Sequence, residues 1–191
     1  HYTGYVAPTP AGLHPDQLGK GEIIVSAGGG SVGTALFECA VKAAHLNPAL
    51  KWRMLIGGTN PGAEIARLQG MAIGSELRIE PARPDFRQLL YHAATSVSMC
   101  GYNTALDLLQ AGTPSVFIPF DDGDEVEQTL RAKSLTKHPS FAVVPSKRLT
   151  PQVLLKAIQS VQDAGRFNSG DLEFNGADET VRITTELMQS L

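Results

Sequence analysis

A carboxylate interrupts an otherwise apolar helical pattern in CGYNTALDLLQAGTP, residues 100–114. The pattern predicts a helix that begins after Gly101 and ends at Gly112, with Asp107 just over one turn inside it. Two roles fit this carboxylate. It accepts hydrogen bonds from both hydroxyls of a ribose while Thr104 and the helix N-terminus bind a phosphate, or Thr104 and Asp107 form a capping-box-like arrangement. The spacing alone leaves both roles open.

A glycine-rich loop, AGGGSVG at residues 27–33, follows an apolar run and precedes a helical pattern. Gly28, Gly30 and Gly33 fit the G-x-G-x-x-G pattern. A dinucleotide site also needs an acidic residue at the end of the second strand, and residues 55–58 carry none. The loop therefore predicts phosphate binding, or a tight turn alone, rather than an NAD or FAD site. A P-loop is excluded because no Lys-Ser/Thr pair follows the glycines.

The remaining polar groups favour neither a metal centre nor a self-contained hydrolase. Asp122 and Asp124 resemble a D-x-D ligand pair for Mg²⁺, but acids at a helix start are common for electrostatic reasons, so we predict no metal. Glu127 and Gln128 lie one turn further on, where they reach ligand hydroxyls or form a solvated helix face. The histidines have no metal-ligand spacing and no G-x-S-x-G motif occurs.

Alternating strand and helix patterns position these residues. Strands are predicted at 22–27, 51–58, 75–80, 95–101, 114–120 and 141–145, and helices at 34–46, 61–72, 84–94, 101–112, 125–137, 149–165 and 177–190. Such alternation predicts an α/β fold, a doubly wound, Rossmann-like parallel sheet of about six strands with helices on both faces. Ligands of such a sheet bind beyond the carboxyl ends of its strands, where the loops discussed above lie.

Composition limits the domain organisation and the class of partner. The 191 residues are 42% hydrophobic with a net charge of −3, which fits one domain and favours neither nucleic acid nor an anionic membrane as main partner. We predict a linker at 1–20, the domain at 21–166, and a loop with a C-terminal helix at 167–191. The chain starts at His1 rather than Met, which suggests a fragment of a longer protein.

Two isolated cysteines, Cys39 and Cys100, match no Cys-x-x-Cys pattern. Cysteines of this kind are typical of reduced, buried residues in a cytosolic protein. No apolar run approaches the ~20 residues of a membrane span, and no signal peptide is visible. We therefore expect a cytoplasmic location and no membrane span.

The sequence resembles the C-terminal domain of GT-B glycosyltransferases of the family 28 type, which includes the N-acetylglucosaminyltransferases that make peptidoglycan lipid II. The resemblance is carried by the GGGSVG loop, by CGYNTALDLLQAGTPSVFIPF and by EQTLRA. It covers residues 22–165 and is most specific at 101–120. It implies one Rossmann-like half of a two-domain GT-B fold, whose active site lies in the cleft between the halves.

The resemblance assigns roles to the residues that match the family's motifs. Asp107 matches the ribose-binding glutamate and Thr104 a threonine near the diphosphate, while the loop at Ala82 and Arg83 matches backbone groups that meet the uracil edge. The Gly-Gly-Ser loop faces the phosphates, and a polar pair on a later helix holds the sugar hydroxyls. The expected nucleotide-sugar-binding residues are Gly29, Gly30, Ser31, Arg83, Gly101, Asn103, Thr104, Asp107, Glu127 and Gln128.

Three positions depart from the family pattern. Asp107 replaces a glutamate, which shortens the reach toward a ribose by one methylene. Glu127 replaces the first glutamine of the sugar-binding pair, which leaves the identity of the sugar open. The family's arginine just before the domain has no match near Ala7 and Pro8. Even so, the missing carboxylate after the second strand and the resemblance together favour the ribose contact for Asp107 over a cap.

The resemblance implies a donor-binding domain that moves a hexosamine-type sugar from a UDP-sugar, with UDP-N-acetylglucosamine the favoured donor. The acceptor site and the catalytic residues are expected on an N-terminal domain missing from this chain. No cofactor or metal is expected, because backbone N–H groups and helix dipoles stabilise a leaving diphosphate. A UDP-sugar 2-epimerase-like domain and a non-catalytic nucleotide-binding module are the alternatives.

Overall fold

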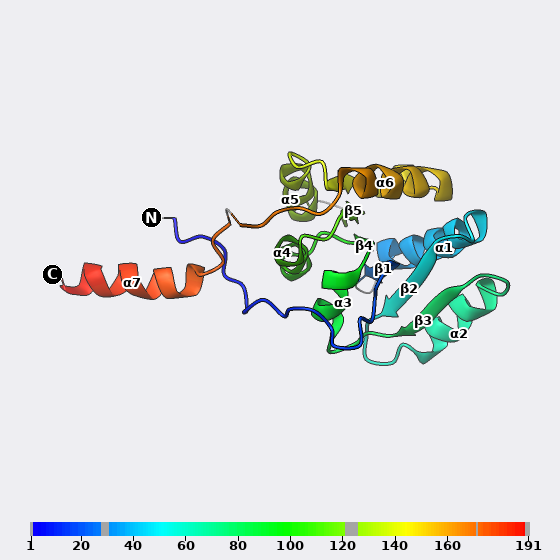
Figure 1. Cartoon of the computed structure of the whole chain (residues 1–191), viewed down its shortest axis with the longest axis horizontal. Coiled ribbons are helices and arrows are strands. Elements are labelled where there is room, and N and C mark those ends of the chain that lie inside the picture. Colours follow the sequence, from blue (N-terminus) through cyan, green and yellow to red (C-terminus); the bar gives the residue numbers. More distant parts are fainter. Residues whose placement is uncertain (1, 28–30, 121–125, 171, 190–191) are drawn as a thin grey trace.

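The computed structural model describes residues 2–27, 31–120, 126–170 and 172–189 of the chain (Figure 1). Every strand and helix predicted from the sequence occurs there, with ends shifted by a few residues. The elements are β1 (Glu22–Ala27), α1 (Ser31–Leu46), β2 (Lys51–Ile56), α2 (Gly62–Met71), β3 (Leu77–Pro81), α3 (Phe86–His92), β4 (Thr95–Ser98), α4 (Tyr102–Ala111), β5 (Ser115–Phe117), α5 (Glu127–Leu135), β6 (Phe141–Val143), the 3₁₀ helix η1 (Ser146–Arg148), α6 (Pro151–Ala164) and α7 (Gly176–Gln189).

The six strands form one parallel sheet in the order β3-β2-β1-β4-β5-β6 (Figure 1). Strand order reverses between β1 and β4, so the loops that follow these two central strands run to opposite sides of the sheet. Such a switch point is where open α/β sheets bind ligands. The predicted doubly wound, Rossmann-like sheet is confirmed.

Two apolar clusters pack on opposite faces of the sheet. Val25 and Val97 belong to the cluster formed with α1, α2 and α6. Ile24 and Leu55 belong to the cluster formed with α3, α4 and α5. Because successive side chains of a strand point to opposite faces, strands covered on both sides are almost continuously apolar, as the sequence pattern indicated.

The predicted ends of two helices have the expected geometry. Thr150 is the N-cap of α6, and its side-chain oxygen accepts a hydrogen bond from the Val153 N–H at 3.2 Å. Gly112 ends α4 in the left-handed region with φ +66°. A Cβ at Gly112 would collide with the carbonyl oxygen of Phe167, so this position requires glycine for two reasons.

The N-terminal segment, residues 2–20, lies along α3 and α4. Gln110 donates through Nε2 to the carbonyl oxygen of Pro8 at 2.9 Å, and Arg87 donates through Nη2 to that of Thr9 at 3.0 Å. The segment contains no helix in its described residues, as expected for a linker, yet it is hydrogen-bonded to the domain. The boundary at residue 20 stays a prediction.

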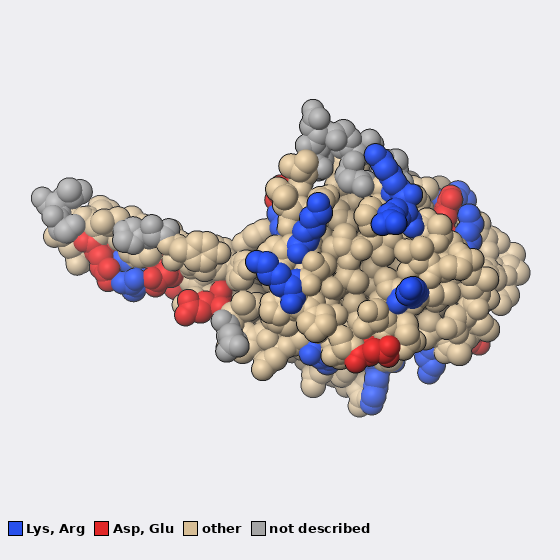
Figure 2. Space-filling model, turned by 90° about the horizontal axis from the view of Figure 1, so that it is seen from above, with Lys and Arg blue, Asp and Glu red and all other residues tan. Residues whose placement is uncertain are grey.

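Helix α7 extends away from the rest of the chain, close to the N-terminal segment (Figure 1). Tyr5 connects the two regions: its N–H donates to Glu173 at 3.1 Å and its carbonyl oxygen accepts from the Gly176 N–H at 2.9 Å. Figure 2 shows acidic side chains gathered along the projecting helix and basic ones spread over the body on the same face. The acids of α7 are Asp178, Glu179 and Glu186.

Both cysteines are buried and neither forms a disulfide, which confirms the prediction of reduced residues. Burial raises the pKa of the Cys39 thiol to about 11 and that of Cys100 to about 12. Both thiols are therefore protonated near neutral pH and poor nucleophiles. No helix in the described part of the chain has the length and apolar character needed to cross a membrane.

Candidate nucleotide-binding site

A cavity of about 450 Å³ opens at the carboxyl-terminal edge of the sheet, on the face covered by α3, α4 and α5. Its walls come from the ends of β1, β2 and β4 and from the first turns of these helices. The cavity thus occupies the switch point between the two central strands. The lining residues are Ser26, Ala27, Leu55, Gly57, Ala82, Arg83, Phe86, Ser98, Met99, Gly101, Thr104 and Gln128.

The two sides of the cavity differ in chemistry. Leu55, Ala82 and Phe86 form an apolar wall at the β2 and β3 side. Gly101 and Thr104, at the start of α4, form the opposite side. A ligand with a flat apolar part and a charged part therefore finds complementary surroundings at the two ends.

The N-terminus of α4 is open at the polar side. Gly101 is the N-cap, no side chain caps this end, and the Ala105 N–H donates to the Gly101 carbonyl oxygen at 2.9 Å. The N–H groups of residues 102–104 precede that first bond and have no carbonyl group within the helix to bond to. Thr104 and Asp107 thus do not form the capping-box alternative. A helix of this kind attracts an anion at its N-terminus through free N–H groups and its dipole.

Of the polar pair on α5, Gln128 lies in the cavity and Glu127 faces solvent. Gln128 lines the cavity, and its Oε1 accepts a hydrogen bond from the Phe120 N–H at 3.2 Å. The Glu127 side chain is 72% exposed and forms an ion pair with Arg131. Arg131 also donates through Nη1 to the Cys100 carbonyl oxygen at 2.7 Å, which fixes α5 to the turn before α4.

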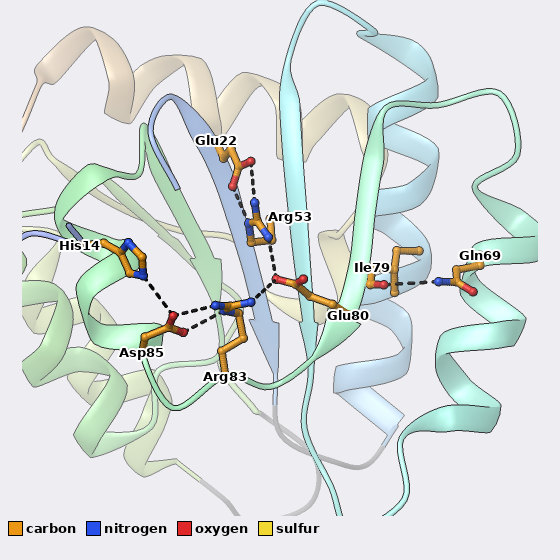
Figure 3. Close-up of polar contacts among 8 residues, drawn as sticks. All are labelled: His14, Glu22, Arg53, Gln69, Ile79, Glu80, Arg83 and Asp85. Carbon is orange, nitrogen blue, oxygen red and sulfur yellow. Dashed lines mark hydrogen bonds and ion pairs between the residues drawn. The ribbon is translucent and has the colours of Figure 1, made fainter. Parts of the chain in front are cut away.

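A buried arginine on β2, Arg53, binds carboxylates on both neighbouring strands, β1 and β3 (Figure 3). Arg53 is 2% exposed and donates to both carboxylate oxygens of Glu22, at 2.6 and 2.9 Å, and to Glu80 at 2.6 Å. Burial alone would lower the pKa of Arg53, but the hydrogen bonds to the two glutamates outweigh it, and the pKa lies above its ordinary value. The positive charge of Arg53 is therefore paired with two carboxylates inside the fold.

The ion pairs of Glu80 continue into the loop after β3, where Arg83 lies (Figure 3). Arg83 lies 3.8 Å from Glu80 and donates to both oxygens of Asp85, at 2.8 and 2.7 Å. Asp85 also contacts His14, whose Nε2 lies 3.2 Å from Asp85 Oδ2. The Arg83 hydrogen bond is the main reason why the pKa of Asp85 lies below its ordinary value. Arg83 thus lines the cavity with its guanidinium already engaged.

Asp107 lies beside the main cavity rather than in its wall. Its Oδ1 accepts a hydrogen bond from Arg87 Nε at 2.7 Å, and its side chain is 14% exposed. Burial raises the pKa of the Asp107 carboxyl, and the hydrogen bond from Arg87 offsets only part of that rise. Together with Pro8, Asn103 and Leu106, the pair lines a second cavity of about 290 Å³.

The structure gathers part of the predicted site. Arg83, Gly101, Thr104 and Gln128 share the main cavity. The other predicted residues lie elsewhere: Asn103 and Asp107 line the adjacent cavity, Glu127 faces solvent, Ser31 begins α1, and Gly29 and Gly30 lie outside the described residues, as do Asp122 and Asp124. In the described residues, no group of three His, Cys, Asp or Glu side chains has metal-site geometry.

Among the residues at these cavities that the sequence did not single out are two serines and two residues at the start of α3. Ser26 and Ser98 are polar residues near the ends of apolar strands, a signal that was available in EIIVSA and TSVSMC. Phe86 and Arg87 begin α3, and only the folded contact between α3 and α4 brings Arg87 to a carboxylate.

The sequence matches the glycosyltransferase family 28 C-terminal domain over residues 24–172. It is 29% identical over 136 residues to the UDP-N-acetylglucosamine--N-acetylmuramyl-(pentapeptide) pyrophosphoryl-undecaprenol N-acetylglucosamine transferase of Polaromonas naphthalenivorans. That alignment covers 70% of this chain and 38% of the relative, so the chain spans well under half of that protein.

Solved structures share the fold. The crystal structure of MurG from Acinetobacter baumannii matches with a TM-score of 0.69 and 20% identity, over 86% of this chain and 50% of that one. UDP-GlcNAc 2-epimerase from Neisseria meningitidis, solved with UDP-GlcNAc, matches with a TM-score of 0.56 and 13% identity, over 88% and 44%. Fold likeness at such identities does not separate a transferase from an epimerase. The match over residues 24–172 shows the family, and by it the chain belongs to the glycosyltransferase family 28 C-terminal domain family.

Proposed function

We propose that this chain is the donor-binding half of a glycosyltransferase that moves a hexosamine from a UDP-sugar, with UDP-N-acetylglucosamine as the favoured donor. The observation that carries the proposal is the cavity at the switch point, with an apolar wall on one side and the open N-terminus of α4 on the other. The diphosphate binds the N–H groups of residues 102–104 and Thr104, and the base packs against Leu55 and Phe86.

The two smaller features of the site fit the remaining parts of a nucleotide sugar. Asp107 accepts hydrogen bonds from the ribose hydroxyls through the carboxylate oxygen that Arg87 does not bind. Gln128 reaches the sugar through its amide nitrogen, because its Oε1 is held by the Phe120 N–H. From the sequence pattern alone, Gly29, Gly30 and Ser31 are further candidates for binding the phosphates.

The acceptor site and the catalytic base belong to a second domain outside this chain, so the chain alone binds the donor without transferring its sugar. The length of the Polaromonas relative, of which this chain covers 38%, supports this division. The two free, buried cysteines support a cytosolic location.

Isothermal titration calorimetry of the chain tests the proposal. UDP and UDP-N-acetylglucosamine are expected to bind with Kd values well below 1 mM, which means a binding free energy of more than about 4 kcal/mol. NAD, which needs a ribose carboxylate at the end of β2, is the matched control and is expected not to bind. Failure to bind either uridine ligand at millimolar concentration would contradict the proposal, and binding of NAD would favour the dinucleotide site instead.

A further inference from the structure

The loop between β3 and α3, residues 82–85, forms part of the wall of the main cavity. Ala82 and Arg83 line the cavity, and all four residues of the loop are exposed or half-buried. The backbone of the loop is bonded near its two ends. The Ala82 N–H donates to the Ile56 carbonyl oxygen at 2.8 Å, and the Arg83 carbonyl oxygen accepts from the Phe86 N–H at 3.3 Å. Between these two bonds the loop is held by side chains.

Asp85 is the side chain that holds this loop (Figure 3). It occupies the N-cap position of α3, where an aspartate usually accepts a hydrogen bond from the first turn of the helix. The Asp85 carboxylate makes no such bond. Instead, Arg83 donates to both of its oxygens, and His14 Nε2 lies 3.2 Å from Oδ2. The carboxylate therefore serves the loop rather than the helix.

His14 reaches Asp85 from the N-terminal segment and is itself fixed on two sides. Its Nδ1 accepts a hydrogen bond from the Asp16 N–H at 3.2 Å, so the neutral ring carries its proton on Nε2 and donates it to Asp85. Its carbonyl oxygen accepts from Nε2 of His92, the last residue of α3, at 3.0 Å. The His14 side chain is 11% exposed, so water competes little for its bond. The N-terminal segment thus presents a fixed donor to the loop.

Resting on the nucleotide-binding function proposed above, we infer that His14 is a positioning residue for the donor site. His14 does not line the main cavity and does not touch the ligand. Through its bond to Asp85, it keeps the Arg83–Asp85 pair, and with it the cavity wall after β3, in the conformation that receives the nucleotide. A wall that is fixed before binding avoids the cost of ordering it on binding. The N-terminal segment is thus part of the donor site and not only a linker into the domain.

His92 provides a matched control for the test. It is half-buried like His14 and bonds to the same residue of the N-terminal segment, through the His14 carbonyl oxygen. In the described part of the chain it makes no hydrogen bond to the loop, and it does not line the main cavity. Removal of either imidazole takes hydrogen bonding from the segment, so both variants should lower the midpoint of thermal unfolding. Only the loss of the His14 ring frees the Asp85 carboxylate.

Calorimetric titration of the wild type and of His14→Ala, His14→Gln and His92→Ala with UDP tests the inference. His14→Ala is expected to weaken UDP binding about threefold to tenfold, because the loop must then be ordered when the nucleotide binds. His14→Gln, whose amide nitrogen still donates toward Asp85, is expected to restore most of the affinity. His92→Ala is expected to leave the affinity unchanged.

A double-mutant cycle shows whether His14 acts through Asp85. Asp85→Ala alone is expected to weaken UDP binding at least as much as His14→Ala does. Adding His14→Ala to Asp85→Ala should cause no further loss, because the carboxylate that His14 holds is already gone. Full additivity of the two losses would overturn the inference, since His14 would then act on the site by another route.

Unchanged UDP affinity in His14→Ala would overturn the positioning role while leaving the nucleotide site intact. An equal loss of affinity in His92→Ala would also overturn it, because the loss would then follow from a general loosening of the N-terminal segment. The same holds if His14→Gln restores nothing, because the donor to Asp85 would then not be what the site needs. Failure of the wild type to bind UDP would overturn the proposed function and this inference together.

Discussion

Two polar regions on the same face of the sheet differ in how their groups are bonded. Beneath the loop after β3, the charges of Glu22, Arg53 and Glu80 are paired within the chain (Figure 3). In the main cavity, on the neighbouring strand β4, the Ser98 hydroxyl has no hydrogen-bond partner in the described residues. The comparison teaches that polarity alone does not mark a binding site. The paired charges hold the strands together, whereas an unpartnered group is available to a ligand only where it also lines a cavity, as Ser98 does and Ser96 does not.

The largest expected effect comes from breaking the paired region. Arg53→Ala leaves the Glu22 and Glu80 carboxylates without their partner in a mostly buried site. We expect a loss of about 3–5 kcal/mol in the free energy of unfolding, measured by urea denaturation, because an unpaired buried charge is costly.

The control for this change is the double variant Arg53→Ala with Glu22→Gln, which removes one of the stranded charges. It is expected to recover part of the lost stability. If the double variant is instead less stable than Arg53→Ala alone, the packing of the arginine stem rather than charge pairing explains the loss.

The next effect concerns Asp107, which is paired with Arg87 yet proposed to bind a ligand. Asp107→Ala is expected to weaken UDP binding by about 1–3 kcal/mol in calorimetry, the range for a charge-assisted hydrogen bond. Asp107→Glu, with one more methylene, is expected to retain binding and tests whether the shorter aspartate limits the reach to the ribose.

Gln110→Ala is the matched control for Asp107→Ala. Gln110 bonds to the same arginine, since its Oε1 accepts from Arg87 Nη2 at 2.8 Å, but it is not proposed to contact the ligand. It should lower stability and leave UDP affinity unchanged. If both variants weaken UDP binding equally, Asp107 acts through Arg87 and not on the ribose.

The smallest effect is a pH dependence that separates two carboxylates. The pKa of Asp85 lies below its ordinary value. Its ion pair therefore stabilises the fold above the unfolded pKa of about 3.9, and this contribution is lost as the pH falls through the lower folded pKa. We expect Asp85→Asn to be less stable than the wild type by less than about 1 kcal/mol at pH 7, with the difference vanishing in acid.

The pH dependence of stability at Asp107 is expected to have the opposite sign, because burial raises the pKa of its carboxyl. Its ionised form costs stability above the folded pKa, and protonation removes that cost as the pH falls. Asp107→Asn is thus expected to be neutral or slightly stabilising at pH 7. Urea denaturation between pH 2 and pH 7, which extends below the folded pKa of Asp85, measures both variants, and equal pH profiles would contradict the assigned pKa directions.

Local signals in the sequence predicted the fold and much of the frame of the site. The helix end at Gly112 and the cap at Thr150 depend on neighbouring residues, so their patterns were sufficient. The position of Thr104 at an open helix N-terminus followed from the same reasoning.

Contacts between distant elements could not be read from local patterns. The pairing of Asp107 with Arg87 joins α4 to α3, and that of Arg83 with Asp85 and Glu80 forms where β3 meets α3. The N-terminal segment has a linker's composition, but its carbonyl groups meet donors from Arg87 and Gln110 that lie far along the chain.

A crystal structure of the chain with UDP is the measurement that tests the central claim most directly. The account predicts the diphosphate at the N–H groups of residues 102–104, the base against Leu55 and Phe86, and the ribose hydroxyls toward Asp107. A UDP molecule bound away from the start of α4, or with its base outside this cavity, would contradict the claim.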